Sequence, residues 1–305
     1  MHSDLYILTL LQIPKIGRRT VRSLLDVFSE PIKDLSDLKN QVNIAKQTGI
    51  RRLVIPTDDQ LQTAFNTACT ILDDAGQHRV EVIGFSNPMF PPRLRQIPDP
   101  PVIIYVKGSM DCLLAPSLIA VVGTRSPSPY GEKCAKRFGF RLAEKGIGVV
   151  SGLAIGCDTA AHTGCLAANG QTIAVLAHGL DTVSPARNRD LASQIQDANG
   201  SLVSEYPIGT PARRNSFVDR DRLQIGLSDG LLVVETGVKG GTMHTVKYCG
   251  EQEKPLACLD HPLDYQPHQK SAGNQMLIKD GKAFPLSVAG DLLTFIDQLK
   301  NRENN

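Results

Sequence analysis

The sequence VVGTRSPSPYG (residues 121–131) joins an apolar segment to a turn rich in glycine and proline. Residues 118–122 are short, continuous and rich in β-branched side chains, which predicts a buried strand. A helix is predicted to begin near Tyr130, after the prolines. A helix N-terminus attracts negative charge, while Gly123 allows close backbone approach and Arg125 adds a positive charge. The stretch therefore predicts a phosphate site.

The same strand–turn–helix pattern recurs over residues 118–261. Six apolar runs predict strands: LIAVVG, IGVVSG, TIAVLA, SLVSE, GLLVVE and PLACLD. Helical patterns lie between most of them, at residues 130–145, 157–168, 187–198, 219–229 and 243–252. Apolar strands that alternate with helices are typical of a sheet covered on both faces. We therefore predict an α/β fold with a doubly wound, mostly parallel sheet.

Three glycine-bearing turns are expected at the carboxyl edge of this sheet, where open α/β folds bind ligands. They are Gly123-Thr124-Arg125, Ser151-Gly152 with the two residues that follow, and Gly240-Gly241-Thr242 before a helix. The Ser151 hydroxyl can donate to phosphate, and two glycines before a helix form an anion nest. Taken singly, each turn is explained more simply by tight strand–helix packing. The presence of three turns at one edge favours a ligand.

The segment PARRNSFVDRDRLQIGLSDG (211–230) predicts a nucleic-acid surface. It holds four arginines around Phe217, namely Arg213, Arg214, Arg220 and Arg222. Arginine suits bidentate phosphate contacts, and an aromatic ring offers a platform for a base. The alternative is a solvated charged face, in which Asp219 or Asp221 neutralises Arg220. Basic side chains around an aromatic residue, next to an edge of the sheet that is expected to bind phosphate, favour nucleic-acid binding.

The remaining sequence predicts smaller parts around the sheet domain. We expect a small helical N-terminal domain (1–75), an extended connector (76–109), the sheet domain (110–285), and a C-terminal helix and tail (286–305). Residues 14–17 have the outline of a helix-hairpin-helix, whose turn amides can bind a phosphate. A hairpin that only packs against the main domain fits equally well. Lys15, Arg18 and Arg19 keep the binding interpretation open.

Composition excludes several classes of protein. The 305 residues carry a net charge of only +2, so a nucleic-acid surface must be a local patch. There is no run of 18 apolar residues and no secretory signal, so no membrane span is expected. The seven cysteines form no Cys-x-x-Cys pair, which argues against structural zinc and disulfides and favours a cytoplasmic location.

No catalytic set is evident in the sequence. His162 and His178 are candidates for acid–base chemistry, but no nucleophile is marked beside either. Glu235 ends a strand, where it could bind a ribose or orient the arginines. The Gly-x-Gly-x-x-Gly fingerprint of dinucleotide sites is absent. We therefore predict a protein that is not an enzyme and has no metal or cofactor.

With these residues in place, the chain resembles the DNA-processing protein A family (DprA, also called Smf) from about residue 80 to 284. The blocks that carry the resemblance are FPPRLRQIPDPPVIIYVKG, VVGTRSPSPYG, VSGLAIGCDTAAHTGCLAANGQTIAVLAHGLD, SEYPIGTP, FVDRDRLQIGLSDGLLVVET, GGTMHT and SAGNQMLIKDG. The resemblance implies a Rossmann-like domain that binds and protects single-stranded DNA and dimerises. It also implies that the protein loads a RecA-type recombinase during natural transformation.

The resemblance also implies roles for individual residues. Arg125 matches the DNA-contacting arginine of the family's Gly-Ser/Thr-Arg block, and the Gly240 turn matches its Ser-Gly-Ser turn. Phe217, Arg220 and Arg222 match its Phe-Pro-x-Arg-Asn-Arg block, in which Asp221 of this chain replaces the usual asparagine. Arg187 lies beside the position of the family's pocket lysine and could replace it.

Three further interpretations stay open. The fold is shared with phosphoribohydrolases of the cytokinin-activating type, but here no carboxylate follows Thr242 before Glu251, where such enzymes have an acid. A sensor of a small nucleotide and a scaffold that recruits a recombinase are two other possible functions of the chain.

The apolar run Met276-Leu277-Ile278 predicts either a homodimer contact or part of the core.

Overall fold

The computed structural model describes residues 3–28, 30–50, 53–266, 268–287 and 289–303. The chain forms two compact units. The first comprises the chain up to Lys107 together with His178–Asp181 and Ser204–Thr210, and the second comprises the rest. No helix in the described ranges combines the length and the apolar character needed to cross a bilayer.

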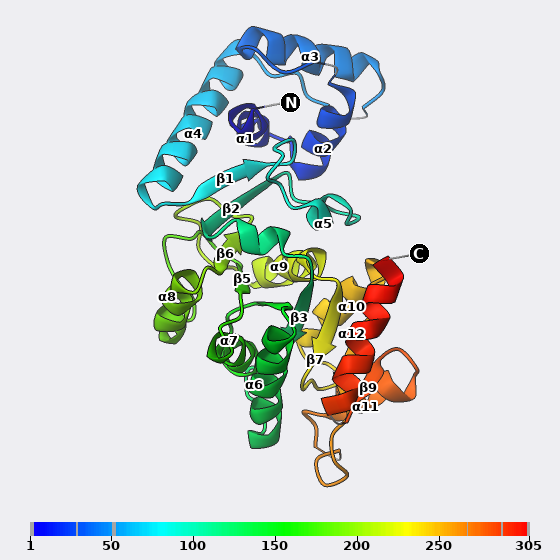
Figure 1. Cartoon of the computed structure of the whole chain (residues 1–305). Coiled ribbons are helices and arrows are strands. Elements are labelled where there is room, and N and C mark those ends of the chain that lie inside the picture. Colours follow the sequence, from blue (N-terminus) through cyan, green and yellow to red (C-terminus); the bar gives the residue numbers. More distant parts are fainter. Residues whose placement is uncertain (1–2, 29, 51–52, 267, 288, 304–305) are drawn as a thin grey trace. The chain divides into compact units, whose positions relative to one another are not determined.

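The first unit consists of helices and one antiparallel strand pair (Figure 1). Its elements are α1 (Asp4–Gln12), α2 (Arg18–Val27), α3 (Leu35–Gln47), α4 (Asp58–Gln77), β1 (Glu81–Gly84), α5 (Pro92–Arg95) and β2 (Ile103–Gly108). Side chains cap the helix starts: Asp34 accepts from a first-turn N–H of α3, and Thr57 forms a capping box with Gln60 on α4. Between α1 and α2, Lys15 has a φ of 69°, a conformation that favours glycine.

The second unit is an α/β sheet domain with strand order β6-β5-β4-β3-β7-β8-β9 (Figure 1). Its strands are β3 (Leu118–Val122), β4 (Gly148–Ser151), β5 (Thr172–Leu176), β6 (Ser201–Ser204), β7 (Gly230–Val233), β8 (Leu256–Leu259) and β9 (Phe284–Leu286). Its helices are η1 (Asp111–Leu114), α6 (Pro129–Glu144), α7 (Cys157–Ala167), η2 (Ala186–Asn188), α8 (Arg189–Asp197), α9 (Arg214–Leu227), α10 (Thr242–Glu251), α11 (Ala272–Lys279) and α12 (Ala289–Glu303). Strand β3 pairs in parallel with both β4 and β7.

Both faces of this sheet are covered by helices. Along β3, Ile119 and Val121 pack into one core cluster with residues of α6, α7 and α12. The alternate residues Ala120 and Val122 pack into a second cluster with residues of α9, α10 and α11. Since successive strand residues point to opposite faces, a continuous apolar strand supplies both cores at once. The predicted doubly wound α/β fold is confirmed.

Helix α9 and strand β9 are among the elements that differ from the sequence prediction. Helix α9 begins at Arg214 rather than near residue 219, and its last turns, from Arg222 to Leu227, are buried all round. A helical segment that is buried on all sides shows no regular alternation of apolar and polar residues. The extent of such a helix is therefore hard to recognise in the sequence. Strand β9 was not predicted, because it has only three residues and includes Pro285.

Glycines allow α6 and α7 to approach each other closely. A Cβ on Gly139 of α6 would overlap the carbonyl oxygen of Ala161, and a Cβ on Gly164 of α7 would overlap that of Lys136. These obstacles are backbone atoms, which cannot rotate away as a side chain can. The crossing therefore depends on both glycines.

Replacing Gly164 with alanine is expected to lower the free energy of unfolding by about 1–3 kcal/mol, because the two helices must separate. Urea denaturation followed by far-UV circular dichroism measures this loss, since the chain has no tryptophan. Gly250→Ala on α10 is the control, because its new Cβ meets nothing within 4 Å. That variant should be neutral or more stable by up to about 1 kcal/mol. Equal losses in the two variants would contradict the close helix contact.

Candidate nucleic-acid interface

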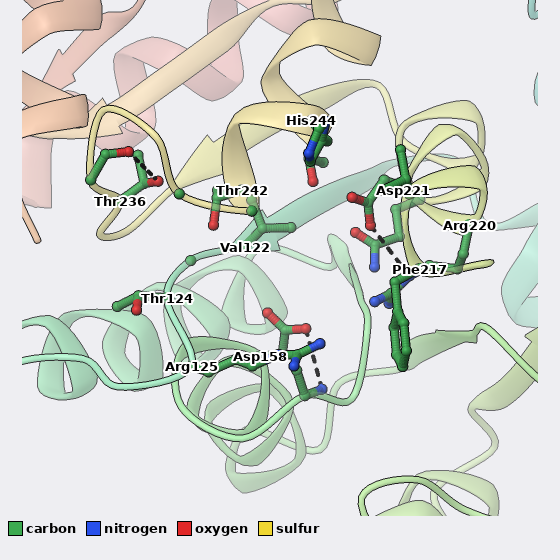
Figure 2. A pocket seen from close by; sticks show the side chains of 18 of the residues that line it. Val122, Thr124, Arg125, Asp158, Phe217, Arg220, Asp221, Thr236, Thr242 and His244 are labelled. Atoms are coloured by element: carbon green, nitrogen blue, oxygen red, sulfur yellow. Dashed lines mark hydrogen bonds and ion pairs between the residues drawn. The ribbon is translucent and has the colours of Figure 1, made fainter. Parts of the chain in front are cut away.

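A pocket of about 550 Å³ opens at the carboxyl edge of the sheet, beside the ends of β3 and β7. Strand β3 lies between β4 and β7, so the strand order changes direction at β3. Such a switch point is where open α/β sheets bind ligands. The turn after β3, the turn after β7, the start of α10 and one side of α9 line the pocket (Figure 2). Segments far apart in the sequence thus share one cavity.

The Gly123-Thr124-Arg125 turn forms one wall of the pocket. The N–H of Thr124 donates to the carbonyl oxygen of Glu235 at 2.8 Å, and the Thr124 carbonyl accepts from Cys157 N at 3.2 Å. A Cβ on Gly123 would overlap the Cys157 sulfur. This glycine is therefore required for packing against α7, as the simpler interpretation of the turn predicts. The Arg125 side chain is exposed in the pocket.

The N-terminus of α6 does not face a ligand as the sequence predicted. The negative charge at this helix start is supplied by the protein itself. The Glu235 carboxylate accepts from Ser128 N at 2.7 Å and lies 3.6 Å from His261 Nε2. Burial raises the pKa of Glu235, but the nearby His261 imidazole and the hydrogen bonding of Ser128 outweigh this effect and leave the pKa below its usual value. Glu235 therefore satisfies a helix terminus and is not available to bind a ribose.

The Ser151-Gly152 turn also uses its donors inside the fold, which corrects their prediction as phosphate donors. The Ser151 hydroxyl, fully buried, donates to the carbonyl oxygen of Val121 at 2.6 Å. The N–H groups of Gly152 and Ala154 donate to Asp158 Oδ2 at 3.1 and 3.3 Å. Gly152 is needed for another reason, since a Cβ there would overlap the guanidinium of Arg220.

The Gly240-Gly241-Thr242 turn lines the pocket, and α10 begins at Thr242. Gly240 N donates to the Gly237 carbonyl, and the N–H groups of Met243 and His244 donate to the carbonyls of Gly240 and Gly241, each at 3.0 Å. The donors left for a ligand are therefore the N–H groups of Gly241 and Thr242, at the positive end of the helix dipole. Lys239 precedes this turn, is exposed and lines the same pocket. The sequence analysis missed this lysine, although its position next to two glycines marks it.

The arginines of the 211–230 segment separate into two groups. Arg214 is exposed and lines the pocket beside Phe217. Arg220 also lines it but is buried, with Nη1 donating to the Val175 carbonyl at 2.8 Å and Nε 3.3 Å from Asp221 Oδ1. Its charge is therefore committed within the protein, as the structural alternative predicts.

Three of the arginines predicted to contact DNA lie outside the pocket lining. Arg222 is 2% exposed and points into the protein, because residues two apart on a helix face opposite ways. This corrects its prediction as a DNA contact. Arg213 precedes the first turn of α9 and Arg187 lies in η2; both are exposed at the surface. They remain candidates for a strand that extends beyond the pocket.

Two buried side chains near Arg220, His162 and Asp158, have shifted pKa values. Burial and, to a smaller extent, the charge of Arg220 lower the pKa of His162 to about 3. The Nδ1 of His162 lies 2.7 Å from the Thr172 hydroxyl. Burial raises the pKa of Asp158, while the charge of Arg220 and two backbone amides oppose that rise. No group of three metal-binding side chains occurs among the described residues.

Asp221 is expected to make anion binding in the pocket depend on pH. Its carboxyl group lines the pocket and is 14% exposed. Burial raises its pKa from 3.8 to about 6, although the charge of Arg220 opposes the rise. Above that pH the carboxylate is ionised and repels a bound phosphate. The same shift means that the contribution of Asp221 to stability is complete below 3.8 and is lost as the pH rises through about 6.

Binding of a labelled oligonucleotide is expected to weaken about three- to tenfold between pH 5.5 and pH 7.5. Asp221→Asn should remove most of this decline, because the amide stays neutral. Fluorescence anisotropy at constant ionic strength measures both proteins. A decline that persists in Asp221→Asn would contradict this role of Asp221.

Two other predicted surfaces look different in the structure. In the first unit, the Arg18 and Arg19 side chains are turned to Asp99, with N–O distances of 2.6 and 3.3 Å. These pairs favour the purely structural hairpin.

In the second unit, Leu277 is buried in the core, and Ile278 packs against the same cluster. Leu277 and Ile278 thus serve the core, as one of the two interpretations of this run predicts.

Comparison with known proteins agrees with this geometry. A family model described as DNA recombination-mediator protein A matches residues 81–297. Protein Smf of Synechocystis is 36% identical over 219 residues, which cover 71% of this chain and 54% of that protein. The chain thus spans about half the length of this curated relative.

Two solved structures extend the similarity. DNA processing protein A (DprA) from Streptococcus pneumoniae superimposes with a TM-score of 0.77 at 26% identity, covering 96% of this chain and 97% of that one. DNA processing protein A from Helicobacter pylori, described with a single-stranded DNA binding mode, has a TM-score of 0.63 at 28% identity over 73% of this chain and 97% of that one. Fold, ordered sequence blocks and family match agree, and the chain belongs to the DNA recombination-mediator protein A family.

Proposed function

We propose that this chain binds single-stranded DNA at the pocket, with little sequence preference and without catalysing a reaction. The observation that carries the proposal is the convergence of Arg125, Arg214 and Lys239 with the start of α10 in one cavity. Guanidinium groups bind phosphate bidentately, and the first-turn amides add donors at the positive end of a helix. Such contacts do not depend on the base. The single-stranded DNA binding mode described for the H. pylori protein supports the proposal.

The proposed contacts follow the structure. Gly123, Thr124 and Arg125 lie on one wall, with Arg214 and the Gly240-Gly241-Thr242 turn around the same cavity. Arg213 and Arg187 would contact a strand that runs past the pocket. A single strand can bend its backbone into a concave site, whereas duplex DNA is stiff over about 150 bp. The pocket therefore favours single strands.

Fluorescence anisotropy with a labelled dT oligonucleotide, a matched duplex and AMP tests this function. We expect the single strand to bind at least about tenfold more tightly than the duplex. Its affinity should fall with salt, with a logarithmic slope of about −0.7 for each neutralised phosphate. Equal or tighter duplex binding would contradict the proposal. AMP binding as tight as that of the oligonucleotide would favour a small-nucleotide site, for which a cavity of 550 Å³ has room.

We further propose that the bound strand is protected and passed to a RecA-type recombinase in the cytoplasm, and that the protein acts as a homodimer. The family to which the chain belongs supports this proposal. Light scattering tests the dimer, and a monomer at about 10⁻⁵ M, above the Kd of most stable complexes, would contradict it. The recombinase step is tested by whether the protein accelerates RecA filament formation on strands coated with single-strand binding protein.

A further inference from the structure

The Arg125 guanidinium lies over the ring of Phe217, with its central carbon 5.3 Å from the ring centroid. Arg125 follows β3 and Phe217 is on α9, so the contact joins two walls of the pocket (Figure 2). Among the described residues, no carboxylate forms an ion pair with Arg125. The ring of Phe217 is therefore the contact that orients this guanidinium.

We infer that Phe217 is a positioning residue, which holds the Arg125 guanidinium for its phosphate contact instead of serving as a platform for a base. This inference rests on the proposed DNA-binding function. A free arginine side chain loses rotamer entropy when a phosphate contact fixes it. When the guanidinium is already held over an aromatic face, part of this entropy has been lost before the phosphate binds.

The arrangement also limits what else Phe217 can do. The face of the ring under Arg125 is covered by the guanidinium, and the side chain as a whole is half-buried on α9. A base that stacked on that face would have to displace Arg125 from the pocket. It would then lose the charge that binds the neighbouring phosphate, so the two contacts would compete.

The two roles are separated by a dT oligonucleotide and an abasic deoxyribose-phosphate oligomer of equal length. Phe217→Leu keeps apolar volume but removes the π face. We expect it to weaken both ligands by the same factor, about two- to fivefold. Phe217→Tyr, which keeps a ring, should restore both affinities. In the Arg125→Ala background, Phe217→Leu should cause no further loss.

A loss confined to the dT oligonucleotide, or additive losses in the double variant, would overturn the inference and make Phe217 a base platform. A test without DNA uses the NMR signal of the Arg125 side-chain N–H. Its ring-current shift should be present in the wild type and in Phe217→Tyr but absent in Phe217→Leu, and a shift unchanged in Phe217→Leu would also overturn the inference. If the wild type binds neither oligomer, the proposed function fails, while the NMR comparison still decides the position of Arg125.

Discussion

Replacing Asn274 with alanine is expected to lower the free energy of unfolding of the second unit by about 3–5 kcal/mol. Asn274 is fully buried on α11. Its Nδ2 donates to the carbonyl oxygens of Val233, Val234 and Leu259 at 3.2, 3.0 and 3.1 Å. Its Oδ1 accepts from the N–H of Thr236 at 2.9 Å. One side chain thus joins the carboxyl ends of β7 and β8 to the turn that lines the pocket.

The size of the effect follows from what alanine leaves behind. Each buried backbone group that loses its partner costs about 1–3 kcal/mol, and several lose it together. Thr236 also lines the pocket, so DNA affinity should fall in the same variant. Urea denaturation followed by circular dichroism measures the stability. Asn215→Ala, at an exposed position on α9, is the control and should stay within about 0.5 kcal/mol. A loss below about 1 kcal/mol for Asn274→Ala would show that these groups find other partners.

Arg125→Ala is expected to weaken binding of single-stranded DNA by about 10- to 100-fold and leave the fold intact. A charge-assisted hydrogen bond to phosphate contributes about 1.5–3 kcal/mol, which corresponds to that range. The side chain is exposed, and the contact recorded for it is with the Phe217 ring. Its removal therefore creates no buried cavity and no unpaired charge.

Anisotropy titrations at several salt concentrations measure the affinity and the number of phosphates contacted. The salt slope of the variant should decrease by about one phosphate's contribution. Arg141→Ala is the charge-matched control, because Arg141 is exposed on α6, pairs with Glu144 and lies outside the pocket. Unchanged affinity of Arg125→Ala, or equal losses in the two variants, would place the DNA elsewhere.

Helix α9 shows how a correct pattern can be missed when a boundary is wrong. Arg214, Phe217, Asp221 and Gln224 line the pocket at a spacing of three or four residues, which is one face of a helix. With a start assumed near residue 219, the first turn of this face was not recognised. Arg222 is grouped with the pocket arginines by its nearness in the sequence and by the family block that it matches, although it is buried on the side of the helix opposite to Arg220.

The sequence by itself determined the alternation of apolar strands and helices, the edge of the sheet at which the pocket opens and the positions of the glycine-bearing turns. These features follow from local periodicity and from the conformations that glycine and proline allow. Only the tertiary structure decided which donors are still free for a ligand. Glu235 satisfies the start of α6, Asp158 accepts from the second turn, and Arg220 is held at Val175. Whether a buried polar group is already paired depends on partners brought together by folding, and no local pattern encodes that distance.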